Sequence, residues 1–86
     1  MKSLDYSLLP LERTLSMRRK SRASHYRDIA DRLFPSPIRV GKRAVAWPRY
    51  EVDQVIAAQI SGKPEHEIRE LVARIEAERV TLGRSE

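Results

Sequence analysis

Apolar residues recur at helical spacing in four stretches of this 86-residue chain. In each stretch they stand three or four positions apart, which gathers them on one face of an α-helix. Between the second and third stretches, β-branched residues alternate with other residues on either side of Gly41, a pattern that predicts a β-hairpin. The helices are expected at residues 11–17, 21–33, 48–61 and 64–82, and the hairpin at residues 38–47. The sequence therefore predicts a mainly α fold with a small β-hairpin.

Capping residues set the limits of these elements. Ser21 can act as the N-cap of the second helix, because its hydroxyl can accept the Ser24 N–H. Pro35 and Pro37 end that helix, since each disfavours helical geometry in the residue before it. Gly62 ends the third helix. The resulting units are an N-terminal arm (residues 1–10), a helical unit with the hairpin (residues 11–61) and a C-terminal helix (residues 63–83).

The three longer helices each carry an apolar stripe that is expected to be buried. The stripes are Ala23, Tyr26, Ile29, Ala30 and Leu33; Val52, Val55, Ile56 and Ile60; and Ile68, Leu71, Val72 and Ile75. Asp28 and Arg32 are expected to pair on the outer face of the second helix. The stripe on residues 64–82 can fold back on the domain or pair with a second copy. We favour self-association, as a homodimer or a cooperative array, because a small binding unit gains affinity when several copies bind together.

Positive charge is concentrated in the middle of the chain. Residues 13–49 hold eleven basic and two acidic side chains, a net charge of +9, whereas the whole chain carries only +5. Such a local excess is typical of a surface that binds nucleic acid. On charge alone, an acidic protein or a membrane surface is an alternative partner. RNA binding is disfavoured, because most of the five aromatic residues are expected in the core, which leaves few platforms for stacking bases.

The composition disfavours several other classes of protein. The chain has no cysteine, which excludes disulfides and thiolate metal sites, and His25 and His66 lie too far apart for a zinc motif. No glycine-rich phosphate loop or set of catalytic side chains is present, so we expect neither an enzyme nor a cofactor. No apolar run approaches the roughly 20 residues that span a bilayer, and no secretory signal is recognisable. A cytoplasmic, nucleoid-associated protein without a membrane partner is therefore expected.

The order of the elements indicates a winged helix-turn-helix with an additional C-terminal helix. A short helix, a basic turn and the capped helix at residues 21–33 form the helix-turn-helix, and the hairpin at residues 38–47 forms the wing. The capped helix can place its first turns in the major groove of double-stranded DNA. Lys42 and Arg43, at the hairpin tip, can then reach a neighbouring phosphate strand or the minor groove. Trp47 is expected in the core, where it fixes the wing to the helices.

Several segments resemble one known family. The segment FPSPIRVGKRAVAW, residues 34–47, is similar to the wing of AlpA-type prophage regulators, small DNA-binding proteins of the excisionase/MerR-like winged-helix group. The letters EVD at residues 51–53 match the start of that family's next helix, and SRASHYRDI at residues 21–29 resembles its recognition helix. The resemblance covers residues 8 to about 60.

The turn between the first two helices departs from the family pattern. The family usually has TGLS where this chain has residues 18–21. Arg19 replaces a turn glycine and Lys20 replaces a buried leucine, while Thr14 and His25 stand where apolar residues are usual. We therefore expect a solvent-facing basic turn, and a first helix that either is less firmly anchored than usual in the family or packs differently.

The expected DNA contacts come from the turn, the capped helix and the wing. Arg22 can bind guanine through two hydrogen bonds, or else contact a phosphate. Arg43 can instead be structural, through a pair with Glu51 or Asp53, and His25 can be a buried replacement for an apolar residue. The candidate DNA-binding residues are Arg18, Arg19, Lys20, Ser21, Arg22, Ser24, His25, Arg27, Arg39, Lys42 and Arg43.

The resemblance implies a sequence-specific regulator of mobile-element (prophage) genes that binds double-stranded DNA. Some relatives act as recombination directionality factors, which bend DNA so that an integrase favours excision, and that role uses the same surface. A protein-interaction adaptor is a further alternative. In it the scaffold has lost DNA specificity, and residues 64–82 dock on a partner such as an integrase or RNA polymerase.

Overall fold

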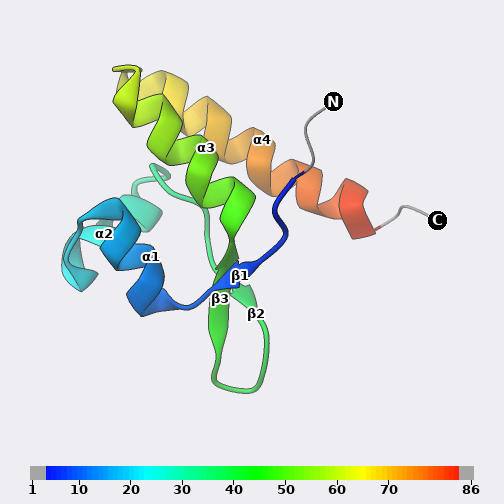
Figure 1. Cartoon of the computed structure of the whole chain (residues 1–86). Coiled ribbons are helices and arrows are strands. Elements are labelled where there is room, and N and C mark those ends of the chain that lie inside the picture. Colours follow the sequence, from blue (N-terminus) through cyan, green and yellow to red (C-terminus); the bar gives the residue numbers. More distant parts are fainter. Residues whose placement is uncertain (1–3, 84–86) are drawn as a thin grey trace.

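A computed structural model describes residues 4–83, which form four helices and a small antiparallel sheet (Figure 1). The elements are β1 (Leu8–Leu9), α1 (Leu11–Arg18), α2 (Arg22–Ala30), β2 (Ile38–Arg39), β3 (Val45–Pro48), α3 (Arg49–Ile60) and α4 (Glu65–Gly83). Helices α1 and α2 lie beside the base of the β2–β3 hairpin, whereas α3 and α4 lie together on the side away from the hairpin tip. This arrangement confirms the predicted fold class, a mainly α structure with a helix-turn-helix, a wing and a C-terminal helix.

The sheet has three antiparallel strands in the order β1–β3–β2. In the hairpin, Ile38 lies opposite Ala46, and the Val40 N–H donates to the Ala44 carbonyl at 3.0 Å. The predicted hairpin is thereby confirmed. The sequence does not predict β1, because two residues are too few to show an alternating pattern. Part of the expected N-terminal arm is therefore an edge strand of the sheet.

Three helices end in the same backbone motif. After α1, α2 and α3 the chain turns through one residue with a positive φ, namely Arg19 (58°), Arg32 (65°) and Gly62 (76°). The next N–H donates to a carbonyl five residues back, from Lys20 to Leu15 (3.2 Å), from Leu33 to Asp28 (2.7 Å) and from Lys63 to Ala58 (3.0 Å). This is the Schellman motif, which satisfies carbonyls left free at a helix end. Because of it, α2 ends at Ala30 and not at Leu33 as predicted.

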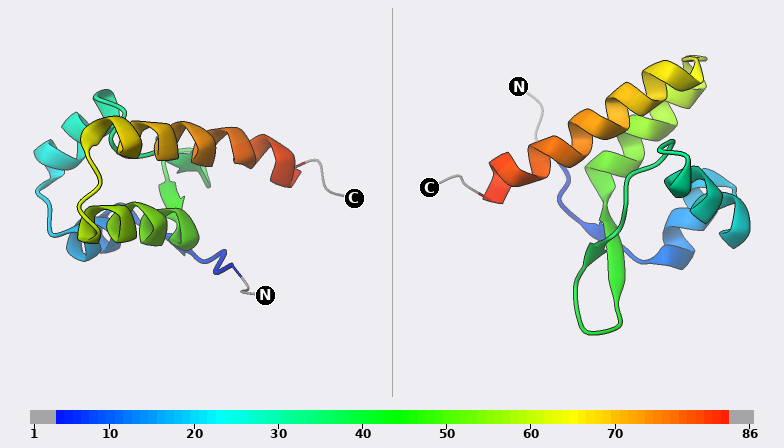
Figure 2. Two further views of the ribbon diagram at one scale, coloured as in Figure 1. Left: turned by 90° about the horizontal axis from the view of Figure 1, so that it is seen from above. Right: turned by 180° about the vertical axis from the view of Figure 1, so that it is seen from behind.

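Helices α3 and α4 run antiparallel, side by side (Figure 2), and pack against each other. Val52 and Val55 of α3 are fully buried, as predicted. Ile60 is 81% exposed, so its predicted burial is wrong. The reason is that residues 61–67 are exposed as well, which means that the turn end of the helix pair projects beyond the core.

Helix α4 folds back on its own chain. Ile68, Val72 and Ile75 are at most 7% exposed and belong to the same core as Phe34 and Trp47. The apolar stripe of α4, on which the expected self-association depends, is therefore covered by the rest of the chain. Its burial is part of the stability of the single molecule.

Polar contacts fasten α4 to α3 and to the segment after α2. The buried Glu51 carboxylate accepts two hydrogen bonds from the Arg79 guanidinium, at 2.6 and 2.9 Å. Arg79 also donates to the Ser36 carbonyl at 2.8 Å. Arg69 donates to the Asp31 carbonyl at 2.9 Å, directly after the last residue of α2. Helix α4 thus supports the helix-turn-helix without being part of it.

Candidate nucleic-acid interface

The first turn of α2 is capped as the sequence predicts. The Ser21 hydroxyl accepts the Ser24 N–H at 3.1 Å, which satisfies one of the backbone donors left free at a helix N-terminus. Arg22, the first helical residue, is exposed directly after this cap. The N-terminus of α2 is therefore fixed by its cap, and its first side chain, which is basic, points into solvent.

The outward face of α2 differs from the predicted one. Its exposed side chains are Arg22, Ala23, Tyr26, Arg27 and Ala30. The expected burial of Ala23, Tyr26 and Ala30 is therefore wrong. Tyr26 is 37% exposed, and the Arg22 guanidinium carbon lies 5.9 Å from the centroid of its ring. Because the two alanines are small, the backbone of α2 can come close to a partner on this side.

The inward face of α2 combines two polar side chains with part of the predicted apolar stripe. His25 is fully buried, and Asp28 and Ile29 are half-buried. The His25 ring packs against Trp47, with 4.9 Å between ring centroids, and against Phe34 at 5.0 Å. Of the predicted apolar stripe, Ile29 and Leu33 pack against the core as expected. The other three members face outward, because the buried position on this helix is filled by a histidine.

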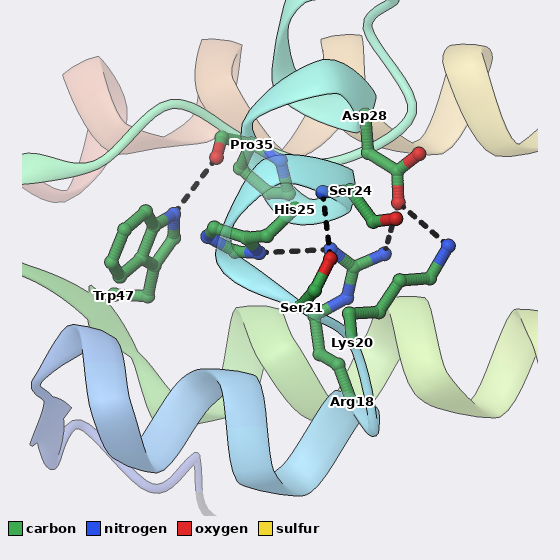
Figure 3. A network of polar contacts seen from close by, with 8 residues as sticks. All are labelled: Arg18, Lys20, Ser21, Ser24, His25, Asp28, Pro35 and Trp47. Carbon is green, nitrogen blue, oxygen red and sulfur yellow. Dashed lines mark hydrogen bonds and ion pairs between the residues drawn. The ribbon is translucent and has the colours of Figure 1, made fainter.

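Arg18 joins α1 to α2 in the interior (Figure 3). Its guanidinium donates to His25 Nδ1 and to the Asp28 carboxylate, both at 2.9 Å, and lies 4.0 Å from the centroid of the Phe34 ring. The Lys20 ammonium reaches the same Asp28 oxygen at 3.0 Å. The side chain of Arg18 is 0% exposed, so the expected solvent-facing Arg18 is wrong. Arg18 and His25 hold α2 in place and do not reach the surface.

The network also fixes the protonation state of His25. Because arginine only donates hydrogen bonds, Nδ1 must be the acceptor, and the proton of the neutral ring is on Nε2. Nε2 has no hydrogen-bond partner within the described residues 4–83 and lies on the side of Trp47 (Figure 3). Burial, followed by the nearby charge of Arg18, lowers the pKa of His25 to about 4. His25 is therefore neutral at pH 7.

Asp28 is the shared acceptor of this network. Burial acts to raise the pKa of Asp28, but the hydrogen bonds from Lys20 and Arg18 outweigh it and hold the pKa below its usual value. Since Asp28 is engaged by residues of α1 and the turn, the predicted pair between Asp28 and Arg32 is wrong. Lys20 shares the single negative charge of Asp28 with Arg18, so the three groups together keep one positive charge.

The atypical turn leaves the helix-turn-helix intact. Arg19 adopts the left-handed conformation, which disfavours a residue with a Cβ atom by roughly 1–2 kcal/mol. This conformation accounts for the glycine that the resembled family usually has at that place. Thr14, the other departure in α1, is fully buried, and its hydroxyl donates to the Pro10 carbonyl at 3.0 Å. The polar group is satisfied, so the departure does not disturb the packing of α1.

The wing presents two basic side chains at an exposed tip. Lys42 and Arg43 are both exposed, and Arg39 donates to the Lys42 carbonyl at 3.1 Å, which restrains the loop. The alternative structural role of Arg43 is wrong, because Glu51 and Asp53 each pair with a different arginine. The Arg43 guanidinium is therefore available to bind an anionic partner of the protein.

Trp47 ties the wing to the helix-turn-helix. It is fully buried, as predicted, and its indole N–H donates to the Pro35 carbonyl at 2.8 Å (Figure 3). Pro35 lies in the segment that follows α2, so this hydrogen bond joins strand β3 to the end of that helix. The wing and α2 are consequently held in one fixed arrangement.

The predicted contact residues fall into three groups. Exposed are Arg19, Ser21, Arg22, Arg27, Arg39, Lys42 and Arg43; half-buried are Lys20 and Ser24; buried are Arg18 and His25. Tyr26 is exposed although it is predicted in the core, and Arg32 is exposed as predicted but is not among the predicted contact residues. Tyr26 lies four residues after Arg22, so extending the outer face from the capped Arg22 identifies it. The sequence does not predict the left-handed backbone of Arg32, because that conformation depends on the motif after α2.

Most basic side chains of residues 13–49 have no acidic partner within the described part of the chain. Eight basic side chains of residues 13–49 are exposed and make no ion pair with any acidic group within residues 4–83. They are Arg13, Arg19, Arg22, Arg27, Arg32, Arg39, Lys42 and Arg43. Exposed cations without an acidic neighbour attract polyanions such as nucleic acids. These eight side chains, which lie on α1, on α2 and the turns that flank it, and on the wing, are called the basic surface below.

Residues 4–83 contain neither a membrane-spanning helix nor a cluster of metal ligands. None of the helices there combines the length and the apolar character needed to cross a bilayer. In the same part of the chain, no three histidine, aspartate or glutamate side chains gather closely enough to hold a metal ion.

Comparison with known proteins identifies one family. The sequence profile described as "Prophage CP4-57 regulatory protein (AlpA)" matches residues 9–60, which is more than half of the chain. The match runs from β1 to the end of α3 and leaves α4 outside. No curated protein and no solved structure gives a significant match. The chain belongs to the family of AlpA prophage regulatory proteins.

Proposed function

We propose that this protein regulates prophage genes by binding double-stranded DNA at specific sequences. In this proposal α2 enters the major groove, and the wing contacts the adjacent phosphate backbone or the minor groove. The observation that carries the proposal is the basic surface itself: free cations on the outer face of α2 and at the wing tip, with both elements fixed to one core. Membership of a family of prophage regulatory proteins supports the same conclusion.

Helix α2 has suitable dimensions and side chains for the major groove. Its nine residues extend over about 13.5 Å, close to the groove width of about 12 Å. Arg22 is able to donate two hydrogen bonds to guanine O6 and N7. Tyr26, one turn further along the same face, is able to pack against a thymine methyl group or to reach a phosphate with its hydroxyl. Ala23 and Ala30 leave room for the edges of the bases.

The wing supplies contacts that do not depend on sequence. Lys42 and Arg43 neutralise phosphates and release condensed counterions, which gives an affinity that falls steeply with salt. Each phosphate contact contributes about 0.9 to the slope of log K against log salt concentration. Such contacts set the register of a protein on the duplex, while base contacts supply the specificity.

The test compares two charge-reversal variants of the full chain. Lys42→Glu with Arg43→Glu alters the wing tip, and Lys63→Glu with Arg74→Glu gives the same change in net charge on the α3–α4 side. We expect the wing variant to bind random duplex DNA at least roughly 100-fold more weakly at 0.1 M salt, with a shallower salt slope. The α3–α4 variant should lose far less. Equal losses in both variants would remove the wing from the interface.

Sequence-specific recognition is tested on Arg22. In a binding selection from random duplexes, Arg22→Ala should relax the preference at one base pair by about 1–3 kcal/mol while leaving the others unchanged. A uniform loss across all sequences would make Arg22 a phosphate contact. Genome-wide mapping of bound DNA then separates the two biological roles. Sites at promoters support gene regulation, and sites beside an attachment locus support control of excision.

A further inference from the structure

Two arginines in a strained backbone conformation flank α2. Arg19 lies two residues before the Ser21 cap, and Arg32 lies two residues after Ala30, with φ values of 58° and 65°. Residues with a Cβ atom rarely adopt this left-handed conformation. Both side chains are exposed, and neither makes an ion pair within the part of the chain that the structure describes. Strain of this kind concentrates at functional sites.

The neighbours of each arginine are anchored, so the surroundings impose the strained conformation. Around Arg19, the side chains of Arg18 and Lys20 are both held by Asp28. Around Arg32, the Asp31 carbonyl accepts from Arg69 at 2.9 Å, and the Leu33 N–H donates at 2.7 Å to the carbonyl of Asp28. Both arginine side chains therefore project from a rigid turn.

A third turn with the same motif uses glycine. Gly62, after α3, has a φ of 76°, and a Cβ atom there would meet no other atom within 4 Å. The space would thus admit a side chain, and only the backbone conformation favours glycine. The α3–α4 turn lies at the end of the molecule opposite the wing tip (Figure 1). The chain has glycine where this turn is remote from α2, and arginine where it borders α2.

We infer that Arg19 and Arg32 form a clamp that binds the two phosphate strands bordering the major groove, one at each end of α2. This inference rests on the proposed function and adds Arg32 to the contact residues. The length of α2, about 13.5 Å, sets its two ends about as far apart as the groove is wide, about 12 Å. The guanidinium group presents several N–H donors in a plane that fits the oxygens of a phosphate.

The experiment replaces each arginine by glycine in the full chain. Arg19→Gly and Arg32→Gly, singly and together, are compared with the unmodified chain in thermal unfolding and in salt titrations of binding to random duplex DNA. Because glycine relieves the strain, we expect the melting temperature to rise by about 2–6 °C per site. Affinity at 0.1 M salt should fall about three- to ten-fold per site, and the salt slope should shrink by about 0.9 per site.

Two control variants separate charge from backbone conformation. Arg32→Lys keeps the charge and should retain most of the affinity and the salt slope. Gly62→Arg places an arginine in the equivalent turn of α3, and should lower the melting temperature without changing the salt slope. A steeper salt slope in Gly62→Arg would show that an exposed arginine contributes to DNA binding wherever it lies, which would contradict the clamp.

The remaining outcomes show whether the clamp hypothesis fails alone or together with the proposed function. A lower melting temperature in the glycine variants would make the two arginines structural residues and overturn the clamp. Unchanged affinity and salt slope in those variants, with binding by the unmodified chain intact, would overturn the clamp and leave the proposed function standing. Absence of duplex binding by the unmodified chain would overturn both.

Discussion

In the region of α1, α2 and the wing, eight exposed basic side chains have no ion-pair partner in residues 4–83. In the α3–α4 pair, by contrast, most basic side chains form ion pairs with acidic ones. Of the four basic residues between 50 and 83, three are paired: Lys63 with Glu67, Arg69 with Glu65 and Arg79 with Glu51. Like charges that are left free repel one another and do not stabilise the fold. Their concentration in one region therefore favours binding to a polyanion.

Both regions also contain an ion pair in which one side chain is fully buried, and the two pairs connect different helices. Arg79 and Glu51 fix α4 to α3, while Arg18 and Asp28 fix α1 to α2. The first pair supports the fold as a whole. The second pair orients the helix that carries the exposed Arg22 and Tyr26. The same kind of interaction thus serves stability in one region and presentation of a binding surface in the other.

Removing Arg79 should have the largest effect on stability. Arg79→Ala leaves the fully buried Glu51 carboxylate without its cation, which costs about 3–5 kcal/mol of unfolding free energy. Urea unfolding measures this loss. Arg74→Ala, at an exposed position of the same helix, should change stability by less than about 0.5 kcal/mol. Equal effects of the two substitutions would contradict the structural role of the Arg79–Glu51 pair.

Removing Arg18 should affect both stability and DNA binding. Arg18→Met fills the same space without the charge, and we expect a loss of about 2 kcal/mol, because Lys20 still pairs with Asp28. Since α2 is then less firmly oriented, affinity for duplex DNA should fall although Arg18 itself is buried. Binding measured well below the melting temperature checks this. Full affinity in a clearly destabilised variant would show that the network does not orient α2 for binding.

His25 should make the protein sensitive to acid. Its pKa is about 4 in the folded protein against 6.5 for the free side chain, so the unfolded chain binds the proton more readily. Stability from the neutral ring is therefore complete above pH 6.5 and is lost as the pH falls toward 4. Between pH 7 and pH 4.5 we expect the unfolding free energy to fall by about 2 kcal/mol.

The control for this pH dependence is a pair of substitutions, measured by urea unfolding at both pH values. His25→Gln keeps an acceptor for Arg18 and should remove most of the dependence. His66→Gln, at an exposed position of α4, should retain it. The assignment to His25 fails if the two variants behave alike.

Removing an exposed ion pair of α4 should change the free energy of unfolding the least. Glu65→Gln removes the partner of Arg69, which lies 3.6 Å away on the helix surface, and should cost less than about 0.5 kcal/mol. The measurement is again urea unfolding. A loss above about 1 kcal/mol would mean that surface pairing contributes far more to the α3–α4 region than exposed pairs usually do.

Features that depend on a few neighbouring residues could be predicted from the sequence. The cap at Ser21, the helix end at Gly62 and the hairpin around Gly41 are examples, since each needs only local geometry. The exposed wing tip with Lys42 and Arg43 follows from the same local signals.

Features that depend on distant partners could not be predicted. The orientation of α2 is set by the burial of His25 and Asp28, which requires Arg18 from another helix. The apolar Ala23 and Tyr26 consequently mark the wrong face. The fold-back of α4 likewise depends on Arg79 meeting a carboxylate 28 residues earlier in the chain.

The central claim is that the free positive charge of α2, its flanking turns and the wing forms the DNA-binding surface. The most direct test follows the backbone amide NMR signals of the isotope-labelled full chain during titration with duplex DNA. We predict that the largest shifts occur in residues 19–32 and 39–44, with little change in residues 61–78. Shifts concentrated in the α3–α4 pair, with α2 and the wing unaffected, would contradict this account.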